Sequence, residues 1–104
     1  MNRNEVTIDC KLLKRGAIRF TPAGVPIFDF VVGHSSMQME AGSQRKVRCE
    51  VEATAIGELA TSIGALKLNQ PVRISGFLSQ SGIGNRKLAL HVQKVEALRN
   101  GDQA

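Results

Sequence analysis

Residues 20–32, a turn-forming stretch that leads into an alternating apolar run, constrain the fold more than any other part of the chain. Pro22 and Pro26 have no backbone N–H to donate, and Gly24 can adopt the positive φ of a type II turn, so the stretch cannot be helical. After the second proline the side chains alternate, and one face of the run carries Phe28, Phe30 and Val32. This period of two predicts a central β-strand with one buried face.

Four other segments alternate in the same way and predict further strands. The five expected strands cover residues 6–13, 27–36, 45–53, 72–78 and 88–98. Residues 14–16 are expected to end the first strand and to open a loop, running through Val25, that carries Arg19 and Phe20. The polar residues 37–44 are expected to form a hairpin loop.

The alternation also predicts which side chains face the core. On the other four strands the inward positions are expected to be Val6, Ile8, Cys10 and Leu12; Val47, Cys49 and Val51; Val72, Ile74, Gly76 and Leu78; and Leu88, Leu90 and Val92. A glycine within a strand marks a bulge or a close approach of two backbones. Gly76 therefore predicts a sharp bend of the kind that closes a small barrel.

Residues 54–66 change to a helical period, with one stripe formed by Ile56, Leu59, Ala60 and Ile63. Gly57 and Gly64 each cost about 1 kcal/mol relative to alanine, so the helix should be short or irregular. Five strands with a helix between the third and the fourth follow the order of an all-β OB-fold barrel, although the pattern alone also allows an SH3-like barrel. One such domain is expected over residues 1–104, with a frayed polar tail at 99–104.

An excess of positive charge predicts a polyanionic partner. The chain has 14 Lys and Arg against 9 Asp and Glu, a net charge of +5 and a pI near 9.8. This balance is typical of nucleic-acid-binding domains, and a basic surface without a specific partner is the alternative. The N-terminus is polar and no apolar run is long enough to span a membrane, so a cytoplasmic protein is expected.

No constellation of catalytic residues appears, so the chain is expected to be neither an enzyme nor dependent on a cofactor. Residues 82–84, Gly-Ile-Gly, lack the third glycine and the helix of a dinucleotide site and are interpreted as a flexible loop. Cys10 and Cys49 are expected to be buried, reduced thiols. A zinc site that combined them with His34 and His91 would lack closely spaced ligand pairs, so no metal is expected.

An OB-fold binds oligonucleotides on the face around strands two and three and with the loops that join strands one to two and four to five. Basic residues recur in both of these loops and on strand three. Cations there can neutralise phosphates, and exposed aromatic rings can stack on bases. The candidate DNA-binding residues are Lys14, Arg15, Arg19, Phe20, Arg45, Lys46, Arg48, Phe77, Arg86 and Lys87. Phe20 and Phe77 are the candidate stacking platforms, with core packing an equal alternative for Phe77. A merely solvated face is the alternative for the cations.

Four short motifs resemble one known family. They are Thr-Pro-Ala-Gly-Val-Pro at 21–26, Phe-Val-Val-Gly-His at 30–34, Gln-Met-Glu-Ala-Gly at 38–42 followed by Arg45, and Val-Arg-Ile-Ser-Gly-Phe-Leu at 72–78. In this order and spacing they resemble the family of primosomal replication protein N, small bacterial replication-restart proteins related to single-stranded DNA-binding protein. The resemblance implies an OB-fold homodimer that binds single-stranded DNA. It also implies that the protein joins the restart helicase and the helicase-loading proteins and helps to reload the replicative helicase.

The same resemblance implies roles for particular residues. Arg19 matches a basic first-loop residue that the family tends to place before its proline-containing turn, and Arg86 and Lys87 fall in the region of its second basic loop. Some members carry aromatic rings at the positions of Ser43 and Arg48, whereas this chain has neither. A protein-interaction adaptor that makes little independent use of DNA is therefore the alternative function.

Overall fold

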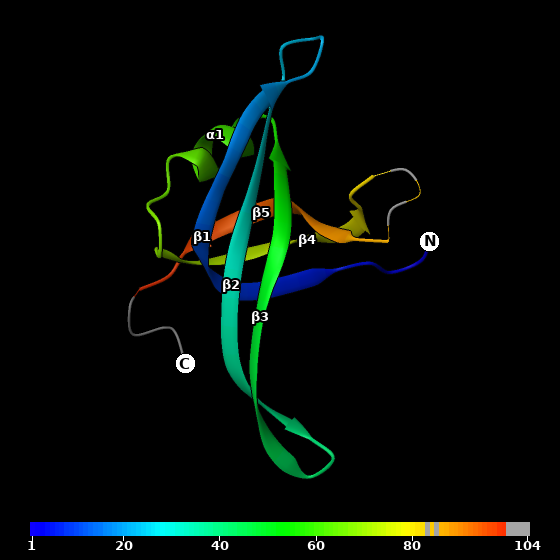
Figure 1. The fold of residues 1–104 in the computed structure, drawn as a ribbon, viewed down its shortest axis with the longest axis vertical. Coiled ribbons are helices and arrows are strands. Elements are labelled where there is room, and N and C mark those ends of the chain that lie inside the picture. The colour runs from blue at the N-terminus through cyan, green and yellow to red at the C-terminus, as the bar shows by residue number, and fades with distance from the viewer. Residues whose placement is uncertain (83, 85, 100–104) are drawn as a thin grey trace.

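The computed structural model describes residues 1–82, 84 and 86–99 and consists of a closed five-stranded barrel with one helix (Figure 1). In chain order the elements are β1 (Val6–Phe20), β2 (Pro26–Glu40), β3 (Ser43–Ile56), α1 (Glu58–Gly64), β4 (Pro71–Gln80) and β5 (Leu88–Ala97). The strands follow the order β1-β2-β3-β5-β4 around the barrel, and only β3 and β5 pair in parallel. This is the OB-fold, which confirms the predicted class. Of the predicted tail, all but Arg99 lies outside the described residues.

β1 continues through residues 14–16, where the sequence predicted its end. Two bulges, one after Leu12 and one after Arg15, bend the strand so that its first half pairs with β4 and its second half with β2. A Cβ on Gly16 would lie 2.3 Å from the carbonyl oxygen of Asp29. Gly16 therefore permits a close approach of two strands, and the prediction of a strand end was wrong.

The β1–β2 turn is shorter than predicted and of a different type. The N–H of Gly24 donates to the carbonyl of Thr21 at 2.8 Å, and the N–H of Thr21 donates to the carbonyl of Val25 at 2.9 Å. Gly24 has a φ of 85°, as expected, but it is the fourth residue of the turn, whereas type II needs a positive φ at the third. The type II prediction was therefore wrong, and Arg19 and Phe20 lie on β1 rather than in a loop.

A two-residue turn, not the predicted loop over residues 37–44, joins β2 to β3. Ala41 and Gly42 have φ values of 51° and 81°, the positive values that a type I′ turn requires. This turn matches the twist of the flanking strands, so they stay paired up to Glu40 and Ser43. The loop prediction failed because the strands here extend past the core and need no apolar face.

We call residues 34–40 of β2 and 43–49 of β3 the ribbon, because they pair with each other and lie beyond the residues that pair with β1 and β5. The ribbon projects from the barrel at the end opposite the β1–β2 turn (Figure 1). Cys49 is exposed on it, which contradicts the prediction of a buried thiol. The barrel core takes Ala53 and Ala55 from β3 instead.

The core is a single cluster inside the barrel and confirms the predicted face of β2. The rings of Phe28 and Phe30 stack with their centroids 5.3 Å apart. The cluster consists of Cys10, Leu12, Phe28, Phe30, Val32, Ala53, Ala55, Ala60, Ile63, Val72, Ile74, Leu90 and Val92. Leu88, predicted to face inward, is 55% exposed because it begins β5 at the rim, and the predicted outward Ala89 is buried.

α1 is as short as its glycines predicted, and it begins only at Glu58. It packs against β2, β3 and β5 through the buried side chains of Ala60 and Ile63. Ile56, predicted on the same stripe, belongs to β3 and is exposed. The prediction of a helical position for Ile56 was wrong, because Ile56 still pairs with Ile27 of β2 although the helical period of the sequence has already begun. The described residues contain no helix that could span a bilayer.

The Asp9–Arg73 ion pair makes stability pH-dependent. Two hydrogen bonds from Arg73 to the Asp9 carboxylate, at 2.6 and 3.0 Å, chiefly hold the pKa of Asp9 below its ordinary value of 3.8. Because the folded-state pKa is lowered, this stabilisation is complete above the unfolded-state pKa, which is the ordinary value, and is lost as the pH falls through the folded-state pKa.

We expect the melting temperature to fall below about pH 4 and Asp9→Asn to flatten that fall. The pair is partly exposed, so its contribution to the free energy of unfolding should be at most about 1 kcal/mol. Thermal denaturation at about pH 7 and about pH 3 measures this loss. Glu5→Gln, which alters a strongly exposed carboxylate, is the control and should keep the wild-type pH profile. An unchanged profile for Asp9→Asn would contradict the expectation.

Candidate nucleic-acid interface

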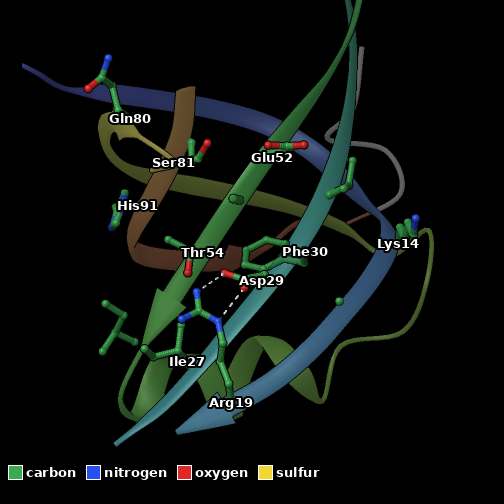
Figure 2. Close-up of a pocket in the computed structure, with 15 residues that line it drawn as sticks. Lys14, Arg19, Ile27, Asp29, Phe30, Glu52, Thr54, Gln80, Ser81 and His91 are labelled. Atoms are coloured by element: carbon green, nitrogen blue, oxygen red, sulfur yellow. Dashed lines mark hydrogen bonds and ion pairs between the residues drawn. The ribbon is translucent and has the colours of Figure 1, made fainter. Parts of the chain in front are cut away.

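A groove of about 530 Å³ lies on the outer face of the barrel, over the sides of β2 and β3 that point away from the core. Its lining includes Lys14, Arg19, Asp29, Thr54, Ser81 and His91 (Figure 2). These residues come from four strands and from the start of the β4–β5 connection. This is the face on which OB-folds bind oligonucleotides.

An ion pair occupies the floor of the groove. Arg19 donates two hydrogen bonds to the Asp29 carboxylate, from Nε to Oδ2 at 3.0 Å and from an Nη to Oδ1 at 3.3 Å (Figure 2). Burial alone would raise the pKa of Asp29, but the hydrogen bonds and the positive charge of Arg19 outweigh it and lower the pKa, so the carboxylate is ionised at neutral pH. The Thr54 hydroxyl is buried beside it, outside hydrogen-bond geometry. Arg19 is thus held in a fixed position in the groove.

The other candidate residues of β1 point in different directions. Lys14 lines the groove. Arg15 instead donates hydrogen bonds to the carbonyls of Gly64 and Leu66, at the C-terminal end of α1. These carbonyls have no partner within the helix, so the charge of Arg15 serves the fold. Phe20 ends β1 and is 66% exposed, as a stacking platform requires.

The ribbon separates the three predicted cations of β3. Lys46 and Arg48 are exposed on the same side of β3 as Thr54, which lines the groove. Arg45 points to the opposite side and forms an ion pair with Glu40. Lys46 and Arg48 therefore extend the groove face along the ribbon, and Arg45 does not.

Acidic side chains lie between these cations. The pairing register places Glu52 across β2 from Lys14, and it places Glu50 across β2 from Lys11. Asp29 lies further along the same face. The outer face therefore carries cations at its β1 margin and on the ribbon, with carboxylates in the middle.

Phe77 lies on the outside of the barrel and is half-buried, so it is neither a core residue nor fully exposed. Its ring stacks on the ring of His91, its direct partner across β4 and β5, with centroids 5.0 Å apart and planes 10° apart. His91 lines the groove, whereas Phe77 does not. In the groove itself the available platform is thus His91, with the ring of Phe77 stacked on it.

The β4–β5 connection brings its cations to the rim of the barrel. The N–H of Ser81 donates to the carbonyl of Lys87 at 2.9 Å, which closes the base of the connection. Arg86 and Lys87 are exposed there, while Ile83 and Asn85 lie outside the described residues. Lys87 is thus held next to Ser81, which lines the groove, whereas neither Lys87 nor Arg86 lines the groove itself.

The four residues weighed as zinc ligands do not form one site. Burial raises the pKa of the Cys10 thiol to about 12, whereas Cys49 is exposed opposite His34 on the ribbon. His34 Nδ1 lies 2.7 Å from the carbonyl of Asp9, and its Nε2 lies 2.8 Å from the Ser36 hydroxyl. Across the part of the chain that the structure describes, no three His, Cys, Asp or Glu side chains converge as metal ligands.

Asp29 was missed by sequence reasoning, although one signal was present. It is the only charged residue in the apolar run over residues 27–32. An ionisable side chain in such a run faces either the core, at high cost, or a functional surface. The alternation predicted that Asp29 faces away from the core, on the side of the strand opposite the buried Phe28 and Phe30. This position could have marked it as a groove residue.

Comparisons of this chain with family models, with the sequences of known proteins and with solved structures agree with one another. Residues 4–94 match the model of a family described as another single-strand binding protein family. The replication restart protein PriB of Nitrosomonas europaea is 39% identical over 98 residues, which cover 94% of this chain and 91% of that protein.

Among solved structures, PriB of Ralstonia solanacearum has a TM-score of 0.87 at 28% identity and covers 94% of this chain and 100% of its own. The single-stranded DNA binding protein of Thermus aquaticus has a TM-score of 0.74 at 23% identity, covering 94% of this chain and 51% of that chain. At this identity the second likeness shows the fold alone.

Proposed function

The chain belongs to the replication restart protein PriB family of single-strand-binding OB-folds, and from that premise we propose that it is a non-enzymatic, single-stranded DNA-binding subunit of the bacterial restart primosome. Acting in the cytoplasm, it assists the restart helicase and the proteins that reload the replicative helicase. The observation that carries this proposal is one outer face with the groove at its centre and with Lys14, Lys46 and Arg48 on both sides of it.

A single strand in this proposal runs from the β1–β2 turn across the groove and onto the ribbon. Phosphates pair with Lys14, Lys46 and Arg48, and with the cations at the rim of the β4–β5 connection. The chain has no Trp and no Tyr, so few rings can stack on bases. Binding therefore depends mainly on phosphate neutralisation and is screened by salt.

We further propose that the protein acts as a homodimer. The unpaired backbone edges of the ribbon support a second copy, because exposed strand edges are covered in most native proteins. Two copies would double the cationic face that a strand can follow. Sedimentation velocity at micromolar concentration measures the oligomeric state, and a monomer there would remove this part of the proposal.

Fluorescence anisotropy with labelled single-stranded and duplex oligonucleotides tests the function. We expect tighter binding to the single strand, and three to five contacted phosphates should give a slope of about −2 to −3.5 for log affinity against log salt. Measurements at about 50 and about 200 mM salt are sufficient to see it. Equal affinity for both forms, or binding that does not change with salt, would contradict the proposal.

The adaptor alternative is favoured by one observation, the carboxylates of Asp29, Glu50 and Glu52 on the same face. Negative charges there repel phosphates and suit a protein partner of mixed charge. In that case the chain would retain purified restart helicase on a resin while binding no oligonucleotide at low salt. Oligonucleotide binding at low salt decides against the adaptor.

A further inference from the structure

We propose that Met37 and Met39 on the ribbon bind bases of the single strand through their thioether side chains. The inference rests on the proposed function, because it requires the outer face to bind a single strand. It adds contacts with bases to a ribbon whose other assigned contacts are with phosphates.

Both methionines are exposed on a part of the fold that needs no apolar side chain. Met37 is 57% exposed and Met39 is 66% exposed, and both lie beyond the core on the outer face of β2. The opposite face of β2 is polar here. The Ser36 hydroxyl lies 2.8 Å from Nε2 of His34 and accepts a hydrogen bond from the Gln38 amide at 3.0 Å. Within this part of β2, apolar side chains are therefore confined to the outer face.

The methionines continue a row of residues that begins in the groove. Val31 lines the groove, and Gly33 and Ser35 line a second hollow, of about 840 Å³, at the base of the ribbon. Alternate residues of a strand share one face and lie about 6.7 Å apart, so the next two positions of this row are Met37 and Met39. A single strand that leaves the groove along β2 therefore reaches both methionines.

Apolar and cationic side chains lie next to each other on this face of the ribbon. Met37 pairs directly with Lys46, and Arg48 lies one position further along the same row of β3, opposite Ser35. On this face, residues 31–39 of β2 contribute no charged side chain. A nucleotide can therefore place its phosphate over β3 and its base over β2. This arrangement fits a polyanion that carries apolar rings.

A thioether is suited to rings of different shape. The methionine side chain is unbranched and polarisable, and its sulfur makes favourable contacts with aromatic rings. Every base has a π-face, so such contacts tolerate any sequence. In a duplex these faces are covered by the neighbouring base pairs, so the contact requires a single strand. The chain has no Trp and no Tyr, and the methionines supply apolar contacts where the ribbon has no aromatic ring.

Anisotropy with two labelled strands of equal length tests the inference. One strand is oligo-dT, and the other is an abasic strand that keeps the phosphates without the bases. Met37→Ser combined with Met39→Ser should weaken binding to oligo-dT about fivefold, within the range for two sulfur–ring contacts. The salt slope should keep its wild-type value, because no charge is removed. On the abasic strand, this serine variant and wild type should bind alike.

Two further variants are the controls. Met37→Leu combined with Met39→Leu keeps the apolar volume, so it should bind oligo-dT more tightly than the serine variant does. Leu68→Ser removes a side chain that is 52% exposed in the connection between α1 and β4 and that lines neither hollow. It should leave the affinity unchanged.

Wild-type affinity of the serine variant for oligo-dT would overturn the inference, and so would an equal loss of affinity on the abasic strand. Wild type that binds the abasic strand as tightly as oligo-dT would overturn it without any variant. A changed sedimentation coefficient for the serine variant would place the methionines in a contact between two copies of the chain and would overturn it as well. Failure of wild type to bind any oligonucleotide at low salt would instead overturn the proposed function, and the inference with it.

Discussion

Gly76→Ala should destabilise the fold by about 3 kcal/mol or more, the upper range for forcing extra volume into a packed site. Gly76 lies at the bulge where β4 shifts its register against β5, after Ser75. A Cβ built there would lie 1.8 Å from the carbonyl oxygen of His91 and 2.8 Å from its carbonyl carbon. Both contacts are with backbone atoms, so no side-chain rotation can relieve them. The β4–β5 pairing, which is one of the pairings of the closed barrel, would have to open at the bulge.

Thermal and urea denaturation measure this loss, and Gly64→Ala is the matched control. Gly64 ends α1, and a Cβ there would meet only the Ile18 side chain, at 3.8 Å. Replacing glycine by alanine in a helix raises the free energy of unfolding by up to about 1 kcal/mol, so this variant should be as stable as wild type or slightly more stable. A wild-type melting temperature for Gly76→Ala would show that the bulge does not constrain the barrel.

Lys46→Glu combined with Arg48→Glu should weaken single-stranded DNA binding by about 25-fold or more at about 0.1 M salt. Each phosphate contact contributes about 0.7 to the slope of log affinity against log salt. At about 0.1 M salt, the loss of two contacts therefore lowers the logarithm of the affinity by about 1.4. The salt slope should flatten by about 1.4 as well. Both side chains are exposed on the ribbon, away from the core, so the fold should be retained.

Anisotropy across a salt series, with a thermal melt of each variant, measures both effects. Lys67→Glu is the control, because Lys67 is exposed in the connection between α1 and β4 and does not line the groove. It should change the affinity only slightly, through net charge. A reduced affinity with an unchanged slope would mean that the ribbon cations act on the fold or on a protein partner rather than on phosphates.

Local periodic signals were sufficient for much of the fold. The alternation from Phe28 to Val32 predicted the buried face of β2, and Gly76 predicted a bulge that is present. Gly57 and Gly64 predicted a short helix between the third and the fourth strand, which α1 confirms. These features depend on residues close together in the chain. The order of elements then led to the OB-fold, and basic composition to a nucleic-acid partner.

Tertiary structure alone decided where strands end and which charges remain available. β1 runs past residues 14–16 because its bulges let it change partners from β4 to β2, and the ribbon exists because a type I′ turn keeps two polar strands paired beyond the core. Among the predicted DNA contacts, Arg15 is bonded to the end of α1 and Arg45 to Glu40, whereas Arg19 is joined to Asp29 in the groove. A charge's partner depends on which strands lie side by side, and barrel closure sets this between residues far apart in the sequence.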